Sequence, residues 1–403
     1  MEHFLNGLFI KMNILIAGAG IGGLTAALCL QKTGHQVQLL EQAPEFTEVG
    51  AGIQCGANAL RVLDYLELKS EIEAIAVDPL RADFREHKTG AVLHSLPFGQ
   101  DYAQRHGAPY LHVHRADLHQ ILANAFNDRA PSAVAFNTTV TSYNEQDDKV
   151  TVQTEDGRQF EGDCLVAADG VKSVIRDQLL GHRAPVFTGN IAWRGLVPAD
   201  RLPADFMDRA VSNFVGPNKH MVIYYLRQQQ LVNFVGVVES DHWAEASWSQ
   251  KAPWQELKND FAGWHPTVQA VIDAVDKDQC YRWALHNHKP FSHWSSARMT
   301  LLGDAAHATL PFMASGAAMA IEDGRILQRA LDQVSNVEQG LQLYQRNRLA
   351  RTAKIQTMST QMGRLYHIKK PFLLRMAFKV LGLLPGKKDQ FLPNYDANTV
   401  TIK

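Results

Sequence analysis

Residues 12–41 read MNILIAGAGIGGLTAALCLQKTGHQVQLLE and indicate the fold of the chain. The short apolar, branched run at residues 13–17 predicts a buried parallel strand. Residues 24–31 are good helix formers and predict a helix, and a second apolar run at residues 36–40 predicts another strand. A strand, a glycine-rich turn, a helix and a second strand in this order predict a βαβ unit, and hence an α/β fold with a parallel sheet.

The turn after the first strand carries Gly18, Gly20 and Gly23 in the spacing G-x-G-x-x-G. In a dinucleotide site the first glycine permits the tight turn, the second lets the backbone approach a pyrophosphate, and the third allows close helix–strand packing. The helix N-terminus offers N–H groups to the phosphates. Glu41 ends the second strand, where a carboxylate accepts hydrogen bonds from a ribose hydroxyl. Glycines alone would also fit an ordinary turn, but the complete order of elements favours a dinucleotide.

The whole chain has the composition of an ordinary soluble globular protein, with 403 residues, 46% hydrophobic and 20% charged, enough for two domains. A net charge of −1 gives no reason to expect nucleic acid as a partner. Residues 14–30 are uncharged, but they are glycine-rich and shorter than a transmembrane helix, so we expect no integral membrane association. Four scattered cysteines without a C-x-x-C motif suit a cytoplasmic protein, and residues 1–11 make a poor secretory signal.

Three histidines, His112, His114 and His119, lie close together in the sequence and require a metal site to be considered. A strand would place His112 and His114 on one face. No carboxylate or third ligand follows at a recognisable spacing, so we expect no metal.

Two later segments also combine an apolar run with an acidic residue beside a glycine. Residues 163–176 read DCLVAADGVKSVIR and contain Asp169 and Gly170. Residues 298–304 read RMTLLGD and continue into a small-residue helix, where backbone amides could meet a ligand. Alternating apolar runs between residues 184 and 283 predict an antiparallel sheet, the best candidate for a second domain.

The motifs GAGIGG with Glu41, AADGVKSVIR, and LLGDAAHATLP followed by ASGAAMAIEDG occur here in one order. Together they resemble the class A flavoprotein aromatic monooxygenases, the family with the p-hydroxybenzoate hydroxylase fold, over about residues 12–361. GAPYLHVHRADLH, NKHMVIYY and WHPTVQAVIDA are similar to the salicylate, 3-hydroxybenzoate and 6-hydroxynicotinate hydroxylases of this family, the last above all. The resemblance implies a Rossmann-like FAD-binding domain and an antiparallel-sheet substrate domain.

The resemblance also implies domain limits. These are a discontinuous FAD-binding domain at residues 12–80, 108–182 and 284–345, a substrate-binding sheet domain at 81–107 and 183–283, and a C-terminal helical segment at 346–403.

The resemblance implies noncovalent FAD, with NADH or NADPH and O2 as co-substrates. The glycines and Glu41 would bind the ADP half, the later Gly-Asp pair would hold the ribityl chain, and the loop at residues 316–318 would face the flavin ring. The implied cofactor-binding residues are Gly18, Gly20, Gly23, Glu41, Arg115, Val140, Asp169, Gly170, Gly303, Asp304, Gly316 and Ala317.

The substrate site departs from the close members of the family. Gln54 and Phe312 stand where the 6-hydroxynicotinate enzyme has histidines, and Ser315 replaces a common glutamine. His220 and Tyr224 are retained; four residues apart on a strand, they share one face, either as catalytic groups or as a buried hydrogen-bonded pair. Together with Trp193, these residues make up the expected substrate site.

The implied reaction is hydroxylation of a small hydroxylated aromatic or N-heteroaromatic substrate, which we expect to be a carboxylic acid. We expect the enzyme to be a monomer or homodimer. NAD(P)H reduces FAD, and the reduced flavin forms a hydroperoxide with O2 that delivers the hydroxyl group. His220 is the first candidate for a base, since its ordinary pKa lies near neutrality. Alternatives are an epoxidase or N-hydroxylase on the same fold, a nicotinamide-dependent dehydrogenase, and a non-catalytic flavin-binding interaction protein.

Overall fold

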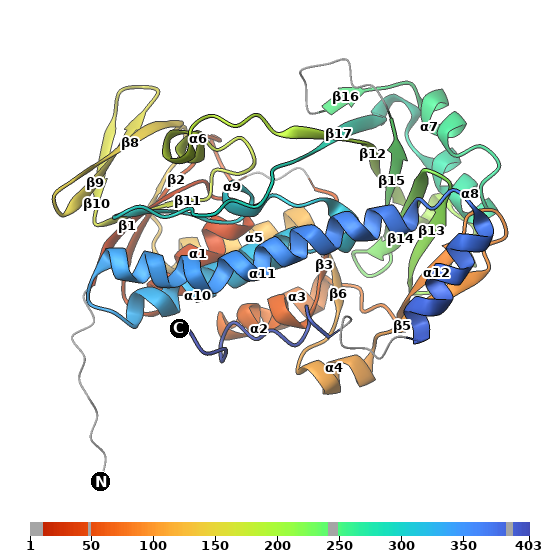
Figure 1. Cartoon of the computed structure of the whole chain (residues 1–403), viewed down its shortest axis with the longest axis horizontal. Coiled ribbons are helices and arrows are strands. Elements are labelled where there is room, and N and C mark those ends of the chain that lie inside the picture. The colour runs from red at the N-terminus through yellow and green to blue at the C-terminus, as the bar shows by residue number, and fades with distance from the viewer. Residues whose placement is uncertain (1–10, 47–49, 241–248, 384–389) are drawn as a thin grey trace, which may run out of the picture.

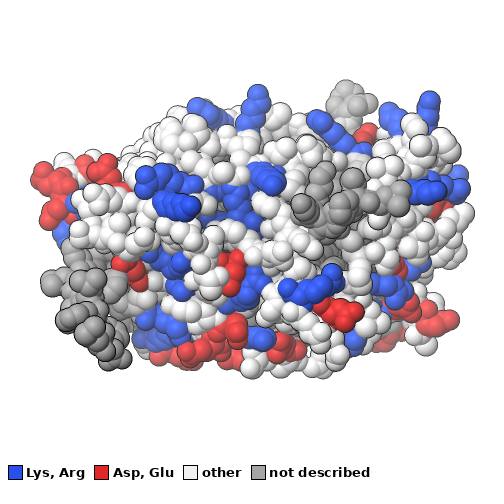
Figure 2. Space-filling model, turned by 60° about the horizontal axis from the view of Figure 1, so that its bottom comes forward, with Lys and Arg blue, Asp and Glu red and all other residues white. Residues whose placement is uncertain are grey.

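A computed structural model describes residues 11–46, 50–240, 249–383 and 390–403. Figure 1 shows an elongated molecule with a sheet region at each end and the long helix α11 (Val337–Tyr366) running along both. No helix among the described residues is long and apolar enough to cross a membrane. Lysine and arginine are interspersed with aspartate and glutamate on the face shown in Figure 2, as expected for a net charge of −1.

The first sheet is parallel and contains the strand predicted at residues 13–17. Its strands, in spatial order, are β18 (Met299–Leu301), β11 (Cys164–Ala167), β1 (Asn13–Ala17), β2 (Gln36–Leu40) and β7 (Val134–Ala135). The carboxyl ends of parallel strands lie at one edge of the sheet. The expected motifs follow β1, β2, β11 and β18, so chain segments far apart in sequence meet at this edge.

The second sheet has eight strands, and all its pairs are antiparallel except β13 with β4. In spatial order they are β16 (Ser249–Lys251), β17 (Tyr281–Asn287), β12 (Val186–Pro198), β15 (Leu231–Glu239), β14 (Lys219–Leu226), β13 (Val211–Gly216), β4 (Arg81–Glu86) and β5 (Val92–Pro97). Helices α7 (Trp254–Asp260) and α8 (Pro266–Ala274) contribute to the apolar core on one face. The other face, here called the inner face, carries His220 and Tyr224.

Two small sheets complete the strands: β3 (Gly52–Cys55) with β6 (Leu111–His114), and β8 (Val140–Gln146), β9 (Lys149–Thr154) and β10 (Gln159–Gly162). Residues 52–55 form β3 because their backbone pairs with β6. The remaining helices are α1 (Ile21–Lys32), α2 (Ala57–Tyr65), α3 (Lys69–Ile75), α4 (Gln100–His106), α5 (Arg115–Arg129), α6 (Val174–Leu180), α9 (Asp304–His307), α10 (Gly316–Asp332) and α12 (Pro371–Leu383). The predicted α/β fold with an antiparallel second sheet is confirmed.

A buried ionic cluster joins α10 to α11. Arg348 contacts Asp323 at 2.6 Å and Glu322 at 2.8 Å, and Arg351 contacts Glu322 at 2.7 Å. Asp323 Oδ2 also accepts the backbone N–H of Gly303 at 3.1 Å and lies 2.5 Å from His307 Nε2. The cluster therefore connects the loop after β18 to the long helix. Buried charges of this kind require such pairing, because an isolated charge is costly to desolvate.

Candidate active site

The edge of the parallel sheet has the shape that a bound phosphate chain requires. Gly18 has a φ of 97°, and a Cβ atom there would lie 2.5 Å from the carbonyl oxygen of Ala168, so only glycine fits between β1 and the segment after β11. A Cβ at Gly20, in contrast, would meet no atom of the described residues within 4 Å. The backbone at Gly20 is therefore open at the N-terminus of α1, where a pyrophosphate binds.

Glu41, which is expected to bind the ADP half, lies directly beside this turn. Glu41 accepts hydrogen bonds from the N–H groups of Ala19 at 2.7 Å and Ala43 at 2.9 Å, which fix its carboxylate beside the glycines. The N–H of Thr138 donates to the Glu41 carbonyl at 2.8 Å. Val140, the first residue of β8, lies two residues further along the chain. Arg115 is exposed at the first position of α5, and its N–H donates to Ala51 at 3.1 Å.

The two segments that combine an acidic residue with a glycine follow the neighbouring strands β11 and β18 at the same edge. Asp169 follows β11, and its carboxylate oxygens are buried near the Ser173 hydroxyl and the backbone N–H of Ile175. Burial raises the pKa of Asp169 above its usual range. Asp304 is exposed, and a Cβ at Gly316 would lie 4.0 Å from its Oδ1, so this acid faces the start of α10 next to Ala317.

These residues fit FAD. A pyrophosphate would fit the open glycine backbone at the helix N-terminus, and the hydroxyls of FAD would fit the carboxylates beside it. The sequence predicted them at four separate strand ends, and the parallel sheet brings those ends together.

Tyr224 lies on the inner face of the eight-stranded sheet, directly against β3 and β6. Its ring is 4.5 Å from the ring of His112, and a Cβ at Gly52 would lie 2.5 Å from its Cε2. Burial raises the pKa of Tyr224 well above its ordinary value, although the positive charge of Arg194 and a hydrogen bond with Gln54 oppose the shift. Tyr224 is therefore a neutral phenol near pH 7.

Gln54 and His112 surround the hydroxyl end of Tyr224. Gln54 Oε1 accepts a hydrogen bond from the Tyr110 hydroxyl at 2.7 Å, so its amide is already oriented. His112 is 1% exposed, and neither ring nitrogen has a hydrogen-bond partner among the described residues. Burial lowers the pKa of His112 to about 3, although the Tyr225 backbone opposes the shift, so this histidine is neutral and offers one nitrogen as a donor and the other as an acceptor. From the sequence alone, His112 is a candidate only for a metal ligand.

Trp193 does not join this group. Successive residues of a strand point to opposite faces, and Trp193 packs in the core on the far face, where its indole donates to Asp260 Oδ2 at 2.7 Å. The next residue, Arg194, faces inward near Tyr224, and it lies close enough to Arg115 for the positive charge of Arg115 to act on it. Its Nε is buried, and no described residue pairs with that atom. Burial, and then the positive charge of Arg115, lower the pKa of Arg194.

His220 lies on the same inner face but in a separate aromatic group. Its ring centroid is 5.3 Å from Phe312 and 5.1 Å from Tyr366, and its Nδ1 is 2.7 Å from Nε2 of His367. Burial and the neighbouring His367 lower the pKa of His220 well below its ordinary value, so His220 is neutral near pH 7. The sequence did not indicate His367, because 147 residues separate the two histidines.

Ser315 shapes the loop before α10 from within. Its Oγ donates to the carbonyl of Met313 at 2.8 Å, and the preceding residue, Ala314, has a φ of 48°. Ser315 is 5% exposed, so its hydroxyl is directed into the loop that it closes.

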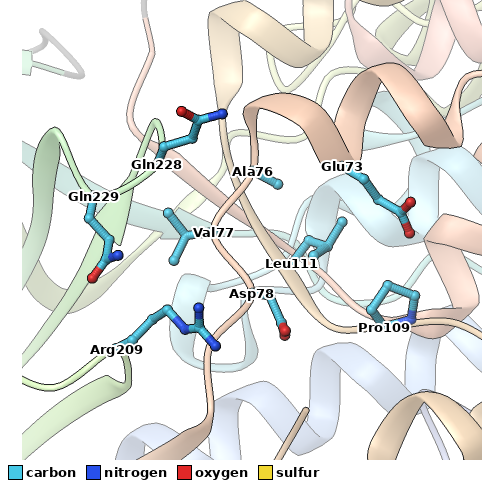
Figure 3. A pocket seen from close by; sticks show the side chains of 9 residues that line it. All are labelled: Glu73, Ala76, Val77, Asp78, Pro109, Leu111, Arg209, Gln228 and Gln229. Carbon is cyan, nitrogen blue, oxygen red and sulfur yellow. The ribbon is translucent and has the colours of Figure 1, made fainter. Parts of the chain in front are cut away.

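A cavity of about 410 Å³ lies outside this group, next to strand β6. Figure 3 shows Val77, Leu111 and Asp78 in its lining, with Arg209 and two glutamines opposite. The backbone of Val77 pairs with that of His112 through two hydrogen bonds. The cavity that Val77 lines is therefore distinct from the group formed by the His112 and Tyr224 rings. The described residues form no cluster of three or more metal-ligating side chains.

The family model described as FAD binding domain matches residues 11–359, and the chain belongs to this family. It is an FAD-dependent monooxygenase that uses NAD(P)H and O2. The chain is 38% identical over 359 residues to the 3-hydroxybenzoate 6-hydroxylase of Polaromonas naphthalenivorans (strain CJ2), covering 88% of each chain. It is 36% identical over 356 residues to the 6-hydroxynicotinate 3-monooxygenase of Pseudomonas fluorescens, covering 86% of this chain and 90% of that one.

Solved structures agree with the fold. Klebsiella pneumoniae HpxO complexed with FAD and uric acid superposes with a TM-score of 0.82 at 26% identity, covering 96% of this chain and 99% of that one. A salicylate hydroxylase substrate complex superposes with a TM-score of 0.81 at 25% identity, covering 96% of each chain.

Proposed function

We propose that this enzyme hydroxylates a ring carbon of a small aromatic or N-heteroaromatic acid that already carries a hydroxyl group. The observation that carries this proposal is Arg194. A guanidinium group with a buried, unpaired Nε beside Tyr224 is costly unless an anion accompanies it. A substrate carboxylate supplies that anion, and arginine binds carboxylates through two parallel hydrogen bonds. The similarity to the 3-hydroxybenzoate and 6-hydroxynicotinate enzymes supports the same substrate class.

The remaining inner-face residues hold a flat ring. Phe312 and the ring of Tyr224 offer aromatic surfaces, and the neutral hydroxyl of Tyr224 with the amide of Gln54 can orient a polar substituent. His220 acts as the general base that takes the proton from the substrate hydroxyl. Its neutral ring can accept a proton near pH 7, which makes the substrate ring more electron-rich.

FAD, when bound, supplies the redox chemistry, namely acceptance of a hydride from NADH or NADPH and activation of O2. The chain would hold FAD at the edge of the parallel sheet: the open backbone at Gly20 would receive the pyrophosphate, Glu41 the ribose, and Asp304 the ribityl hydroxyls. Gly316, at the start of α10, would lie on the side of the flavin ring. FAD is held noncovalently. The inner face excludes water around the reacting ring, since its aromatic and histidine side chains are buried.

The test is a panel of aromatic and N-heteroaromatic acids, with and without a ring hydroxyl, assayed for product as well as for NAD(P)H consumption. We expect a product hydroxylated at a ring carbon from at least one hydroxylated acid. We expect the corresponding amide, which lacks the carboxylate charge, to be a poor substrate. An epoxide or N-hydroxylated product, or equal turnover of acids and amides, would overturn the proposal.

We further place the enzyme in the cytoplasm as a monomer or homodimer. All four cysteines are buried and unpaired, and burial raises the pKa of the Cys55 and Cys164 thiols to about 12, so they remain unreactive thiols. Such cysteines are typical of a reducing compartment.

A further inference from the structure

His220 is the first member of a hydrogen-bonded chain that ends at the surface. Its Nδ1 lies 2.7 Å from Nε2 of His367, and Nδ1 of His367 lies 3.0 Å from Oε1 of Glu239. His220 is 2% exposed, whereas the side chains of His367 and Glu239 are 4% and 42% exposed. The three residues therefore lead from the buried inner face to solvent.

The local structure fixes this arrangement. His220 and Glu239 lie near the same end of neighbouring strands, because Lys219 of β14 pairs with Val238 of β15. His367 caps the C-terminus of α11, and its carbonyl accepts the N–H of Asn218 at 3.4 Å. The N–H of Glu239 in turn donates to Asn218 at 2.9 Å. The ends of two neighbouring strands and the end of one helix thus hold the three side chains together.

The carboxylate at the surface determines which ring nitrogens carry protons. An ionised Glu239 only accepts, so Nδ1 of His367 must donate its hydrogen to it. Nε2 of neutral His367 then accepts from Nδ1 of His220. This leaves Nε2 of His220 as an unprotonated acceptor, the state that a general base requires.

The other titratable groups around the two histidine rings do not compete for the proton. The hydroxyl of Tyr366, on α11, donates to the carbonyl of Phe312 at 3.3 Å. Lys219, the strand neighbour of His220, points to the opposite face of the sheet and donates to the Asp260 carbonyl. Burial lowers the pKa of both His220 and His367, and Glu239 partly offsets this for His367. Neither histidine retains a proton easily, so a proton accepted by His220 has to move on.

We propose that His367 and Glu239 form a proton relay between His220 and solvent, an inference that rests on the proposed role of His220 as base. The substrate O–H bond breaks as a proton binds Nε2 of His220. The Nδ1 proton of His220 passes to Nε2 of His367, and the Nδ1 proton of His367 passes to Glu239, which releases it to water. One proton enters and one leaves, with no change in oxidation state. A proton moving inward when the product oxygen is reprotonated restores the starting tautomers.

The test uses the FAD-loaded enzyme with 3-hydroxybenzoate and 6-hydroxynicotinate as probe substrates, and measures product formation against pH. Glu239→Gln keeps a hydrogen-bond acceptor for His367 but cannot take up a proton. We expect its kcat to fall roughly tenfold or more at pH 7, with KM and FAD content unchanged. The loss should shrink as the pH rises to the range where the substrate hydroxyl ionises in solution. His367→Gln should behave in the same way.

Asp332→Asn is the matched control, since Asp332 also pairs with a buried histidine, His35 at 3.0 Å, but at the end of α10. We expect it to retain parental activity. A loss in Glu239→Gln that is equal at every pH indicates a structural role and overturns the relay, as does parental activity at every pH. In either case a large loss in His220→Gln still supports the base. Normal activity in His220→Gln would overturn the base itself. If His367→Gln fails to load FAD, the pH profile of Glu239→Gln alone decides.

Discussion

The ring of Tyr224 rests on the α-carbon of Gly52, and a Cβ atom there would lie 2.5 Å from Tyr224 Cε2. The methyl group of Gly52→Ala must therefore push the buried Tyr224 ring away from β3. We expect a loss of stability of about 1–3 kcal/mol, the usual cost of overpacking, and a clear fall in kcat/KM. Thermal unfolding of a double-mutant cycle with Tyr224→Ala checks the contact, since the double variant should be more stable than the sum of the single losses predicts. Simple additivity would contradict the contact.

Asp304→Ala should weaken FAD binding more than folding, because this carboxylate is exposed at the start of α9 and is proposed to accept ribityl hydroxyls. Loss of a charged hydrogen bond costs about 1.5–3 kcal/mol, which corresponds to a rise in Kd of roughly tenfold or more. Fluorescence titration of the apoprotein with FAD measures this. An unchanged Kd in a folded variant would remove Asp304 from the cofactor site.

His220→Gln should lower the hydroxylation rate by roughly the 10²–10⁴ typical of general acid–base groups. FAD binding should survive, since His220 lies on the eight-stranded sheet. Because burial keeps His220 neutral, its own protonation should not limit the parent enzyme near pH 7. The loss in the variant should be smaller with a ring-fluorinated substrate, whose hydroxyl is more acidic. Equal rates for parent and variant would make His220 structural.

Arg194→Gln should raise KM for acidic substrates by roughly tenfold or more, the expected cost of losing a charge-assisted hydrogen bond. The same change should have little effect on KM for the corresponding amides. Trp193→Phe provides the control, because Trp193 is the adjacent residue but faces the far side of the sheet. Steady-state kinetics with acid and amide pairs decide the matter. An equal rise in KM for both would show that Arg194 does not bind the carboxylate.

Arg348→Met should destabilise the protein by about 3–5 kcal/mol, the cost of leaving buried charges unpaired. Burial alone would raise the pKa of Asp323, but the charges of His307 and Arg348 and their hydrogen bonds lower it to about 2. A carboxylate with a lowered folded-state pKa stabilises the protein above its unfolded pKa of about 3.9 and loses that effect as the pH falls through the folded value. Denaturant unfolding between pH 4 and 2 should therefore show a shallower decline in Arg348→Met. Parallel profiles would contradict this.

Much of the candidate cofactor site could be predicted from the sequence because its motifs follow buried strands. Gly18, Glu41, Asp169 and Gly303 each come directly after an apolar run, and the carboxyl ends of parallel strands share one edge. The local sequence was therefore sufficient to predict that these residues lie close together. The substrate site was less predictable, because its residues meet through contacts between distant segments.

Two residues illustrate this limit. The sequence pointed to Trp193, whereas the inward side chain is its neighbour Arg194; only the strand pairing sets which of two adjacent residues faces inward. Gln54 lies on β3, and pairing with β6 places it beside His112, which the sequence did not group with it. Both placements depend on partners far along the chain, which a local pattern cannot identify.

Helix α11 contacts both the proposed cofactor side and the proposed substrate side, and the rotation of the helix between these contacts fixes how its side chains are oriented. Arg348 and Arg351 anchor it to α10 on the FAD side, and His367 caps it beside His220. Each residue of an α-helix advances 1.5 Å and turns about 100°. One residue inserted between Arg351 and His367 would leave the ionic cluster intact but turn the imidazole about 100° away from Glu239. The number of residues between these contacts, as much as their chemical identity, therefore sets the alignment of the two halves.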